Sequence, residues 1–382
     1  AYRVLQRCRE LHITELDIAL TLFDNQVLPC LTYGAEVWMP YMKCLMADPI
    51  KAMEAPMERV QLWFLKRFLG LRGTTTSWVV LAEASRAPVY LYALKQVCRL
   101  WNKLACLNEH HLAYRVFLDS IQLAREGVQS WAERTLHVVH RVGACINPVH
   151  MLQGVCPTPP ARTQFKLKEV HQAFDAGLEC WWQVWQHSPR YTFRVYAHEF
   201  KCRRHMDRES NFMFDSSVSN VHKRQLLLFR CFNVKLNKHV AKWERGSSNQ
   251  RARCRCCTMG EVEDEAHVLH DCPLYQALRG RYQIPMVAQP YRFLPCNAHM
   301  VAGFLKAALH LREHPEAIAP GSASEDAGDT VDGVVPDGDR RRLVGGWFWF
   351  LLGVAALTFV GLAFYMTHSM GPRCLPGLSC NL

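Results

Sequence analysis

The chain of 382 residues lacks several motifs by which enzymes are commonly recognised. It contains no P-loop and no Gly-x-Ser-x-Gly nucleophile elbow, which excludes the nucleotide hydrolases and serine hydrolases built on those motifs. It also contains no pair of adjacent aspartates. Helix-like sequence begins directly after Ala1 without a signal-peptide pattern, so we expect this end to be the cut edge of a longer protein.

The 17 cysteines do not form the dense framework of a disulfide-rich secreted domain. Their number is odd, and most of them are scattered through apolar segments. This distribution favours reduced thiols in a chain that faces the cytosol. Outside one cluster, we expect the cysteines to be small core residues, for example Cys30, Cys44, Cys98 and Cys180.

The exception is the motif Cys254-x₂-Cys257-x₉-His267-x₄-Cys272. Three thiolates and one imidazole at this spacing are the ligand set of a closed tetrahedral zinc site. The Cys-x₂-Cys half makes a tight knuckle, and the His-x₄-Cys half suits one turn of helix that runs into an extended exit. Four protein ligands leave no open position, so we predict a structural Zn²⁺ with no catalytic role.

Alternatives to this ligand set stay open. The cysteines could be reduced and buried without a metal, and Cys256 or His270 could replace a neighbouring ligand. The insert between the two halves is acidic, and we expect its carboxylates to form a solvated loop face that offsets nearby arginines. The acidic residues are Glu261, Glu263, Asp264 and Glu265, and the arginines are Arg251, Arg253 and Arg255.

Positive charge is concentrated between residues 190 and 255, where sixteen Lys and Arg face only five Asp and Glu. This excess equals the net charge of +11 of the whole chain, so the remainder sums to zero. Aromatic residues are interleaved with the basic ones: Tyr191, Phe193, Tyr196, Phe200, Phe229, Phe232 and Trp243. Cations that hold phosphates and aromatics that stack on bases are typical of a nucleic-acid groove. A solvated basic face over an aromatic core is the alternative; the adjacent zinc motif favours nucleic acid.

Hydrophobic periodicity predicts a mainly α-helical protein. Residues 10–46 carry one helical face, and Pro29 should kink that helix or mark its boundary. The residues of this face are Leu16, Ala19, Leu20, Phe23, Val27 and Leu31. Residues 57–69 predict a second helix that Gly70 can end in the left-handed conformation, and a third helix starts at Pro88.

The middle of the chain carries fewer signals. Residues 110–142 predict one long amphipathic helix. Three prolines, Pro157, Pro159 and Pro160, mark a linker at 147–162.

Composition changes sharply after residue 318. Residues 319–342 predict a disordered acidic linker, with six acids and no base up to Asp339, that ends in three arginines. The 24 residues 343–366 carry no charge and are long enough to cross a bilayer, which takes about 20 residues. A short tail, 367–382, follows. The arginines before the span place the main body of a single-pass, tail-anchored protein in the cytoplasm; a buried core helix is the alternative.

Two separated segments resemble the C-terminal portion of non-LTR (LINE-type) retrotransposon reverse transcriptases, in that family's order. The first is similar to the thumb and connecting region, at Tyr33-Gly34-Ala35-Glu36-Val37-Trp38, Phe64-Leu65-Lys66-Arg67 and Leu100-Trp101. The second is similar to the family's zinc knuckle and its flanks, at 223–243, the Cys254–Cys272 motif, Cys272-Pro273-Leu274-Tyr275 and 303–313. The resemblance extends over residues 1–313.

The resemblance implies a helical thumb/connection-like region at 1–146 and a basic helical region with the zinc knuckle (254–272) at 163–318. It also implies that the chain derives from a family of RNA-directed DNA polymerases. The catalytic palm domain of such a polymerase holds two metal ions with carboxylates, and two of these carboxylates come from adjacent aspartates. This chain has no pair of adjacent aspartates. We therefore expect the chain not to be an enzyme and to have no small-molecule substrate.

The sequence thus predicts a retrotransposon-derived fragment that lacks the palm and binds RNA or DNA. The expected phosphate contacts are Lys66, Arg67, Arg203, Arg204, Lys223 and Arg224. Two alternatives stay open: a tail-anchored membrane protein that uses the ancestral fold as an interaction scaffold, and a decayed element fragment without function. Nuclear localisation is expected if the membrane span is an artefact of the gene model.

If residues 343–366 span a bilayer, the expressed chain stays in the membrane pellet after an alkaline carbonate wash, because such a wash releases only peripheral proteins. A variant truncated before residue 343 is the matched control and is expected in the supernatant. Recovery of the full chain in the supernatant would contradict membrane insertion.

Overall fold

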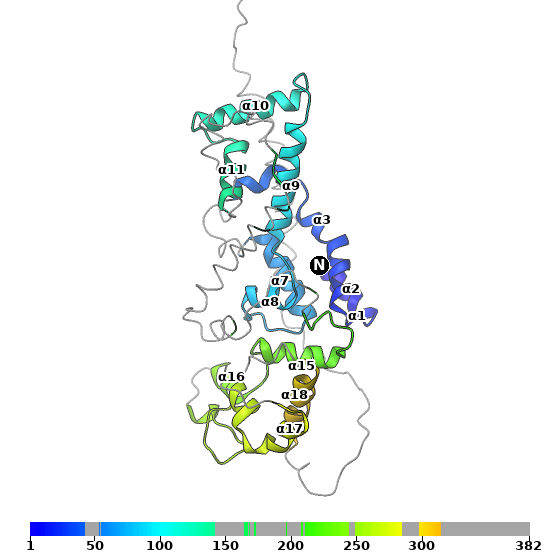
Figure 1. Ribbon diagram of the computed structural model, residues 1–382, viewed down its shortest axis with the longest axis vertical. Coiled ribbons are helices and arrows are strands. Elements are labelled where there is room, and N and C mark those ends of the chain that lie inside the picture. The colour runs from blue at the N-terminus through cyan, green and yellow to red at the C-terminus, as the bar shows by residue number, and fades with distance from the viewer. Residues whose placement is uncertain are drawn as a thin grey trace, which may run out of the picture. The chain divides into compact units, whose positions relative to one another are not determined.

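The computed structural model describes the following parts of the chain: residues 1–42, 53, 55–141, 164–166, 168, 172, 196, 208, 211–243, 249–284 and 298–314 (Figure 1). These residues are mainly α-helical, as predicted, and they contain no β-sheet. Among them, none of the helices is both long and apolar enough to cross a membrane. The predicted linkers at 147–162 and 319–342, the apolar run 343–366 and the tail 367–382 lie outside the described residues.

The predicted helical face is confirmed up to Val27, since its members from Leu16 to Val27 are buried, and so is a boundary near Pro29; residues 43–46 lie outside the described residues. The elements there are α1 (Tyr2–Glu10), α2 (Leu16–Gln26), α3 (Leu28–Leu31), α4 (Ala35–Trp38) and the 3₁₀-helix η1 (Met39–Tyr41). Pro29 lies in the first turn of α3, where the missing N–H of proline costs no intrahelical hydrogen bond. Gly34, at φ +64°, allows the chain to turn into α4.

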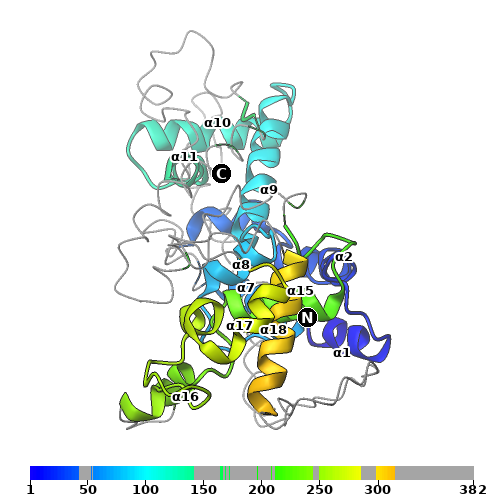
Figure 2. The same cartoon turned by 60° about the horizontal axis from the view of Figure 1, so that its bottom comes forward.

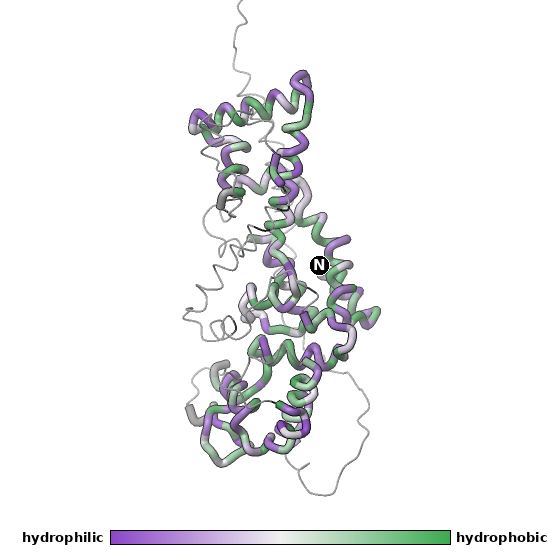
Figure 3. The backbone as a smooth tube through the Cα atoms, in the orientation of Figure 1, coloured by the Kyte–Doolittle hydropathy of each residue, from purple (hydrophilic) through white to green (hydrophobic). Residues whose placement is uncertain are grey.

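The next two predicted helices are also confirmed. They are α7 (Pro56–Phe68) and α9 (Val89–Ala105), with the short α8 (Ser77–Glu83) between them. Gly70 adopts φ +68°, and the Leu71 N–H donates to the Lys66 carbonyl at 2.8 Å, which is the Schellman end predicted for this helix. Hydrophilic and hydrophobic residues alternate along these helices (Figure 3). Many of their apolar residues are buried in the core.

The single long helix predicted at 110–142 is wrong. The chain forms two helices, α10 (Leu112–Arg125) and α11 (Trp131–Arg141), which pack against each other. Gly127 adopts φ +73°, and the Ser130 hydroxyl accepts the Glu133 N–H at 3.2 Å. A left-handed glycine and a serine N-cap outweigh the continuous apolar periodicity, because together they satisfy the backbone groups at a helix end.

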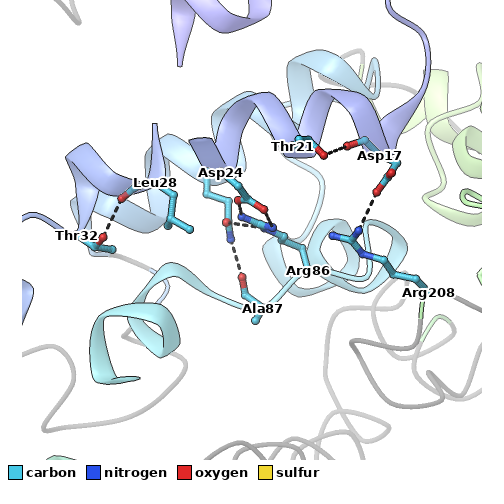
Figure 4. Close-up of polar contacts among 9 residues, drawn as sticks. Asp17, Thr21, Asp24, Leu28, Thr32, Arg86, Ala87 and Arg208 are labelled. Carbon is cyan, nitrogen blue, oxygen red and sulfur yellow. Dashed lines mark hydrogen bonds and ion pairs between the residues drawn. The ribbon is translucent and has the colours of Figure 1, made fainter. Parts of the chain in front are cut away.

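A buried arginine joins the first helices to the segment after α8 (Figure 4). The Arg86 guanidinium makes a two-pronged contact with the Asp24 carboxylate, and its Nε donates to Gln61. Gln61 in turn donates to the Ala87 carbonyl at 2.9 Å. The Arg86 side chain is 2% exposed, so removal of Asp24 would leave an unpaired buried cation, which typically costs about 3–5 kcal/mol.

A second buried pair connects α8 to α15 (Asn220–Arg230). Arg230 Nε and the Tyr196 hydroxyl both donate to Glu83 Oε1, at 2.8 and 2.6 Å. Tyr196 and Phe229 are each 1% exposed, and Phe232 is buried as well. These aromatics of the basic block therefore belong to the core. Within the described residues they favour the alternative of a basic face over an aromatic core.

The C-terminal elements surround the cysteine motif. They are α16 (Asn237–Trp243), the 3₁₀-helices η3 (Asn249–Ala252) and η5 (Pro273–Tyr275), the π-helix η4 (His267–Asp271), α17 (Gln276–Arg281) and α18 (Ala298–Glu313). Helices α15 and α18 pack against each other (Figures 1 and 2). Gly303 permits close approach on α18, since a Cβ there would lie 2.7 Å from the Tyr282 ring.

The expectation that isolated cysteines are core residues holds for one of its examples and fails for another. Cys98 is fully buried, and burial raises the pKa of its thiol to about 12. Cys30 is exposed, with its thiol donating to the Gln26 carbonyl one turn back. Cys44 and Cys180 lie outside the described residues.

Glu58 is fully buried on α7, with one carboxylate oxygen accepting the Tyr90 N–H at 2.7 Å. Burial raises the pKa of this carboxyl from 4.5 to about 7. The unfolded chain therefore loses its proton at lower pH than the folded chain. The free energy of unfolding falls as pH rises from 4.5 to 7, by roughly 3 kcal/mol.

In the Glu58→Gln variant this part of the pH dependence disappears, because glutamine keeps the acceptor for Tyr90 and does not titrate. Urea unfolding at pH 5, 6, 7 and 8 measures it. Glu10→Gln, at an exposed position, serves as the control and keeps the wild-type slope. Equal slopes in all three proteins would refute a buried, titrating Glu58.

Candidate metal centre

The structure brings the four predicted ligands together. Cys254 and Cys257 lie in the turn after η3, His267 begins η4, and Cys272 directly follows η4. One ligand atom from each residue lies within 4.8 Å of all the others. His267 Nε2 faces the cysteines, at 3.5 Å from Cys257 Sγ.

These separations fit a tetrahedral zinc ion. Zn–S bonds of about 2.3 Å and Zn–N bonds of about 2.0–2.1 Å place neighbouring S and N ligands about 3.5 Å apart, and two S ligands about 3.8 Å apart. The distance between Cys257 Sγ and His267 Nε2 equals the first value. Three sulfurs and one imidazole nitrogen are a ligand set suited to zinc. The cluster could therefore hold a metal ion such as zinc.

A short hairpin shapes the first half of the site. Cys254 N–H donates to the Glu261 carbonyl, and Glu263 N–H donates to the Ala252 carbonyl, both at 2.8 Å. Gly260, at φ +69°, lets the chain reverse between them. Inside the turn, the Cys256 N–H points at Cys254 Sγ at 3.4 Å, a contact that favours the thiolate.

The second half of the site is one wide helical turn with an extended exit, as predicted. His267 N–H donates to Asp264 Oδ1 at 3.0 Å, which caps the turn. Five residues on, Cys272 N–H donates to the His267 carbonyl at 2.8 Å, and Cys272 itself is extended at ψ 118°. The π-type turn thereby places both side chains at the cysteine cluster.

Burial of the cluster disfavours ionised thiolates that have no bound metal. Cys254 and Cys272 are buried, and loss of solvent raises the pKa of both thiols. A divalent cation reverses this effect, because it stabilises coordinated thiolates strongly enough to displace their protons. The same burial excludes solvent from three of the four ligands, which suits a closed structural site.

Cys256 and His270 do not enter the four-atom cluster. Cys256 forms a second group with Cys254 and Glu263, also within 4.8 Å. The carboxylate of Glu263 is already occupied, since it accepts from the Asn237 N–H at 2.7 Å and from Arg312 at 2.6 and 2.9 Å. The geometry therefore favours His267 and Cys257 as the partners of Cys254.

The prediction that the acidic insert is a solvated face is wrong for two of its members. Glu263 is 1% exposed and Glu265 is 0% exposed, whereas Glu261 lies at the surface. Their partners are not the neighbouring arginines. Glu263 pairs with Arg312 on α18, Asp264 with Lys238 on α16 at 2.9 Å, and Glu265 with His239 on α16.

The sequence offered no local signal for these pairs, because the partners lie 26 to 49 residues away along the chain. Glu263 and Glu265 must give up their hydration to enter the core, and their hydrogen bonds with Arg312 and His239 offset that cost. Glu265 already lies in the helical turn that leads into the π-helix, whereas Glu263 precedes it, in the segment that pairs with Ala252.

Four of the six predicted phosphate contacts lie in the described part of the chain; Arg203 and Arg204 lie outside it. Lys66 Nζ donates to the Gly73 carbonyl at 2.7 Å, and burial lowers the pKa of this lysine. The Arg224 guanidinium covers Gly70, with its nearest nitrogen 3.0 Å from where a Cβ would lie.

This contact places Arg224 of α15 at the end of the helix that carries Arg67, and both arginines are exposed. Lys223 is partly exposed on α15. The four residues thus belong to neighbouring elements, but Lys66 is largely engaged within the chain.

Comparison with protein-family models, with curated proteins and with solved structures finds no match to this chain.

Cys257→Ser is expected to abolish zinc binding, because it removes one of four ligands and serine is a poor substitute for a thiolate. Cys256→Ser, one residue away, is the matched control and is expected to retain about one zinc ion per chain. Elemental analysis of the purified chains measures zinc content, and thermal unfolding measures the loss of stability. Equal zinc content in the two variants would contradict the ligand assignment.

Proposed function

We propose that these 382 residues are the zinc-stabilised, helical C-terminal region of a non-LTR retrotransposon reverse transcriptase, that they bind nucleic acid and that they do not include the catalytic palm. The observation that supports it best is the convergence of Cys254, Cys257, His267 and Cys272 into one cluster. The resemblance of residues 1–313 to the thumb, connecting region and zinc knuckle of that family supports the rest.

The role of zinc in this proposal is structural. The segment between its ligands pairs with α16 through Asp264 and Glu265 and with α18 through Glu263. A metal ion that fixes both halves of the knuckle also fixes these three carboxylates. Zinc binding would then contribute folding free energy to the whole C-terminal group of helices.

Nucleic-acid binding in this proposal occurs mainly through phosphates. Arg251 and Arg255 are exposed at the knuckle, and Arg67 and Arg224 are exposed on α7 and α15. In contrast, Tyr196, Phe229 and Phe232 are buried and are not available for base stacking. Exposed cations beside aromatics that are buried, in the described part of the basic block, favour contact with the backbone, which tolerates many sequences.

The proposal does not include polymerase activity. The metal-binding aspartates of a palm are absent from the sequence, and the predicted zinc site has no open position for chemistry. The uncharged run at 343–366 supports an alternative function as a tail-anchored scaffold, and this alternative is compatible with nucleic-acid binding by the main body.

Fluorescence polarisation with a labelled RNA or DNA duplex, titrated at several salt concentrations, tests the proposal. If about six phosphate contacts form on duplex DNA, affinity falls roughly 10³-fold between 50 and 200 mM salt, because bound counterions are released on association. The double variant Arg67→Gln/Arg224→Gln should reduce the slope of log affinity against log salt by about 2.

The control for this experiment is Lys103→Gln/Arg125→Gln, which removes the same charge from exposed positions on α9 and α10. It is expected to keep the wild-type slope. The absence of binding to either nucleic acid at 50 mM salt would rule out the proposed function.

A further inference from the structure

Two histidine side chains meet between α15 and α18, outside the metal centre. The rings of His222 on α15 and His299 on α18 meet edge to face, with centroids 5.0 Å apart. Lys306 is exposed two turns further along α18 and contributes positive potential at His222. Helices α15 and α18 pack against each other, so this arrangement is part of the helix packing.

These three side chains have no anionic partner among the residues that the structure describes. No carboxylate lies within 4.0 Å of any of them in the described ion pairs, which involve other residues. His222 Nδ1 is buried and has no hydrogen-bond partner. A buried ring nitrogen without a hydrogen-bond partner is costly, and a ligand that reaches the ring would offset this cost.

The surroundings of His222 oppose protonation of its ring. Burial lowers the pKa of His222, and His299 and Lys306 lower it further by repulsion. On α15 itself the adjacent charged groups are Lys223 and Arg224. Two carboxylates lie near the start of α15, but both are engaged with neutral groups: Glu15 accepts from Asn220, and Asp215 accepts from Ser217.

A metal ion fits this cluster less well than an anion. Among the described residues, the groups of three or more metal-ligating side chains all contain Cys254, and none contains His222 or His299. Two imidazoles without a third ligand make a weak metal site. An oxyanion, in contrast, accepts hydrogen bonds from protonated rings and from a lysine, and the first turn of α18 offers the positive end of a 16-residue helix.

We propose that His222, His299 and Lys306 form a binding site for the phosphodiester backbone of nucleic acid. This site rests on the proposed nucleic-acid-binding function and assigns it a place on the α15–α18 pair. It adds residues that the charge pattern of the sequence did not single out. A phosphate stabilises the protonated rings, so affinity rises as pH falls through the range in which the histidines titrate.

Fluorescence polarisation of the full chain with a labelled single-stranded RNA or DNA, at pH 6 and pH 8 and constant ionic strength, tests the site. Wild type should bind roughly threefold to tenfold more tightly at pH 6, as one additional hydrogen bond of typical net strength would give. His222→Gln and His299→Gln should each remove most of this difference. Lys306→Gln should lower the slope of log affinity against log salt by about 1 at both pH values.

Two variants at exposed positions control for charge and for the other histidines. His110→Gln, in the turn before α10, is expected to keep the pH difference, and Lys103→Gln on α9 is expected to keep the salt slope. Far-UV circular dichroism and thermal unfolding confirm that each variant folds. If His222→Gln alone unfolds the chain, His299→Gln and Lys306→Gln decide the result, since both positions are exposed.

The possible results distinguish failure of the proposed site from failure of the proposed nucleic-acid-binding function. If wild type binds nucleic acid but the three variants behave like the two controls, the site is refuted while nucleic-acid binding stands. If wild type does not bind at pH 6 in 50 mM salt, the proposed function fails and the site fails with it. Loss of the pH difference in His222→Gln and His299→Gln, with both controls unchanged, supports the site.

Discussion

The carboxylate of Glu263 lies inside the protein, where it accepts hydrogen bonds from Arg312 of α18 and from the backbone of Asn237 at the start of α16. Arg312 also donates to the Asn237 side chain, and that side chain donates to the Arg253 carbonyl beside the first cysteine of the cluster. A single buried negative charge therefore connects two helices and the knuckle. Such a charge is tolerated only while its partners stay in place, because an unpaired buried carboxylate costs several kcal/mol.

The cysteine cluster and this ion pair constrain each other. Cys254 N–H and Glu263 N–H form the two backbone hydrogen bonds of the hairpin, so a movement of either residue displaces the other. Next along the chain, Asp264 caps the π-helix that begins with His267 and pairs with Lys238. A metal ion at the cluster and the buried carboxylates would thus both hold the segment between Cys254 and His267 in the same conformation.

Local signals in the sequence predict the helix ends where one residue type decides the backbone. Gly70 ends α7 and Pro29 lies in the first turn of α3 for reasons that apply to any chain. Gly127 and Ser130 are local signals for the break between α10 and α11, but the apolar periodicity of that segment continues across them. The spacing of the cysteine motif predicts the side chains that meet in the cluster for a similar reason, since all four lie within nineteen residues.

The sequence by itself determined the helical class, the ends of several helices and the four members of the Cys/His cluster, because each of these depends on contacts between residues close along the chain. Only the tertiary structure decided that Glu263 and Glu265 are buried with Arg312 and His239, that Tyr196 and Phe229 belong to the core, and that His222 meets His299. The composition of the sequence shows which charged and aromatic residues are present, but it does not show which residues they contact. Those neighbours are set by how distant helices pack, and packing also decides which charges are desolvated.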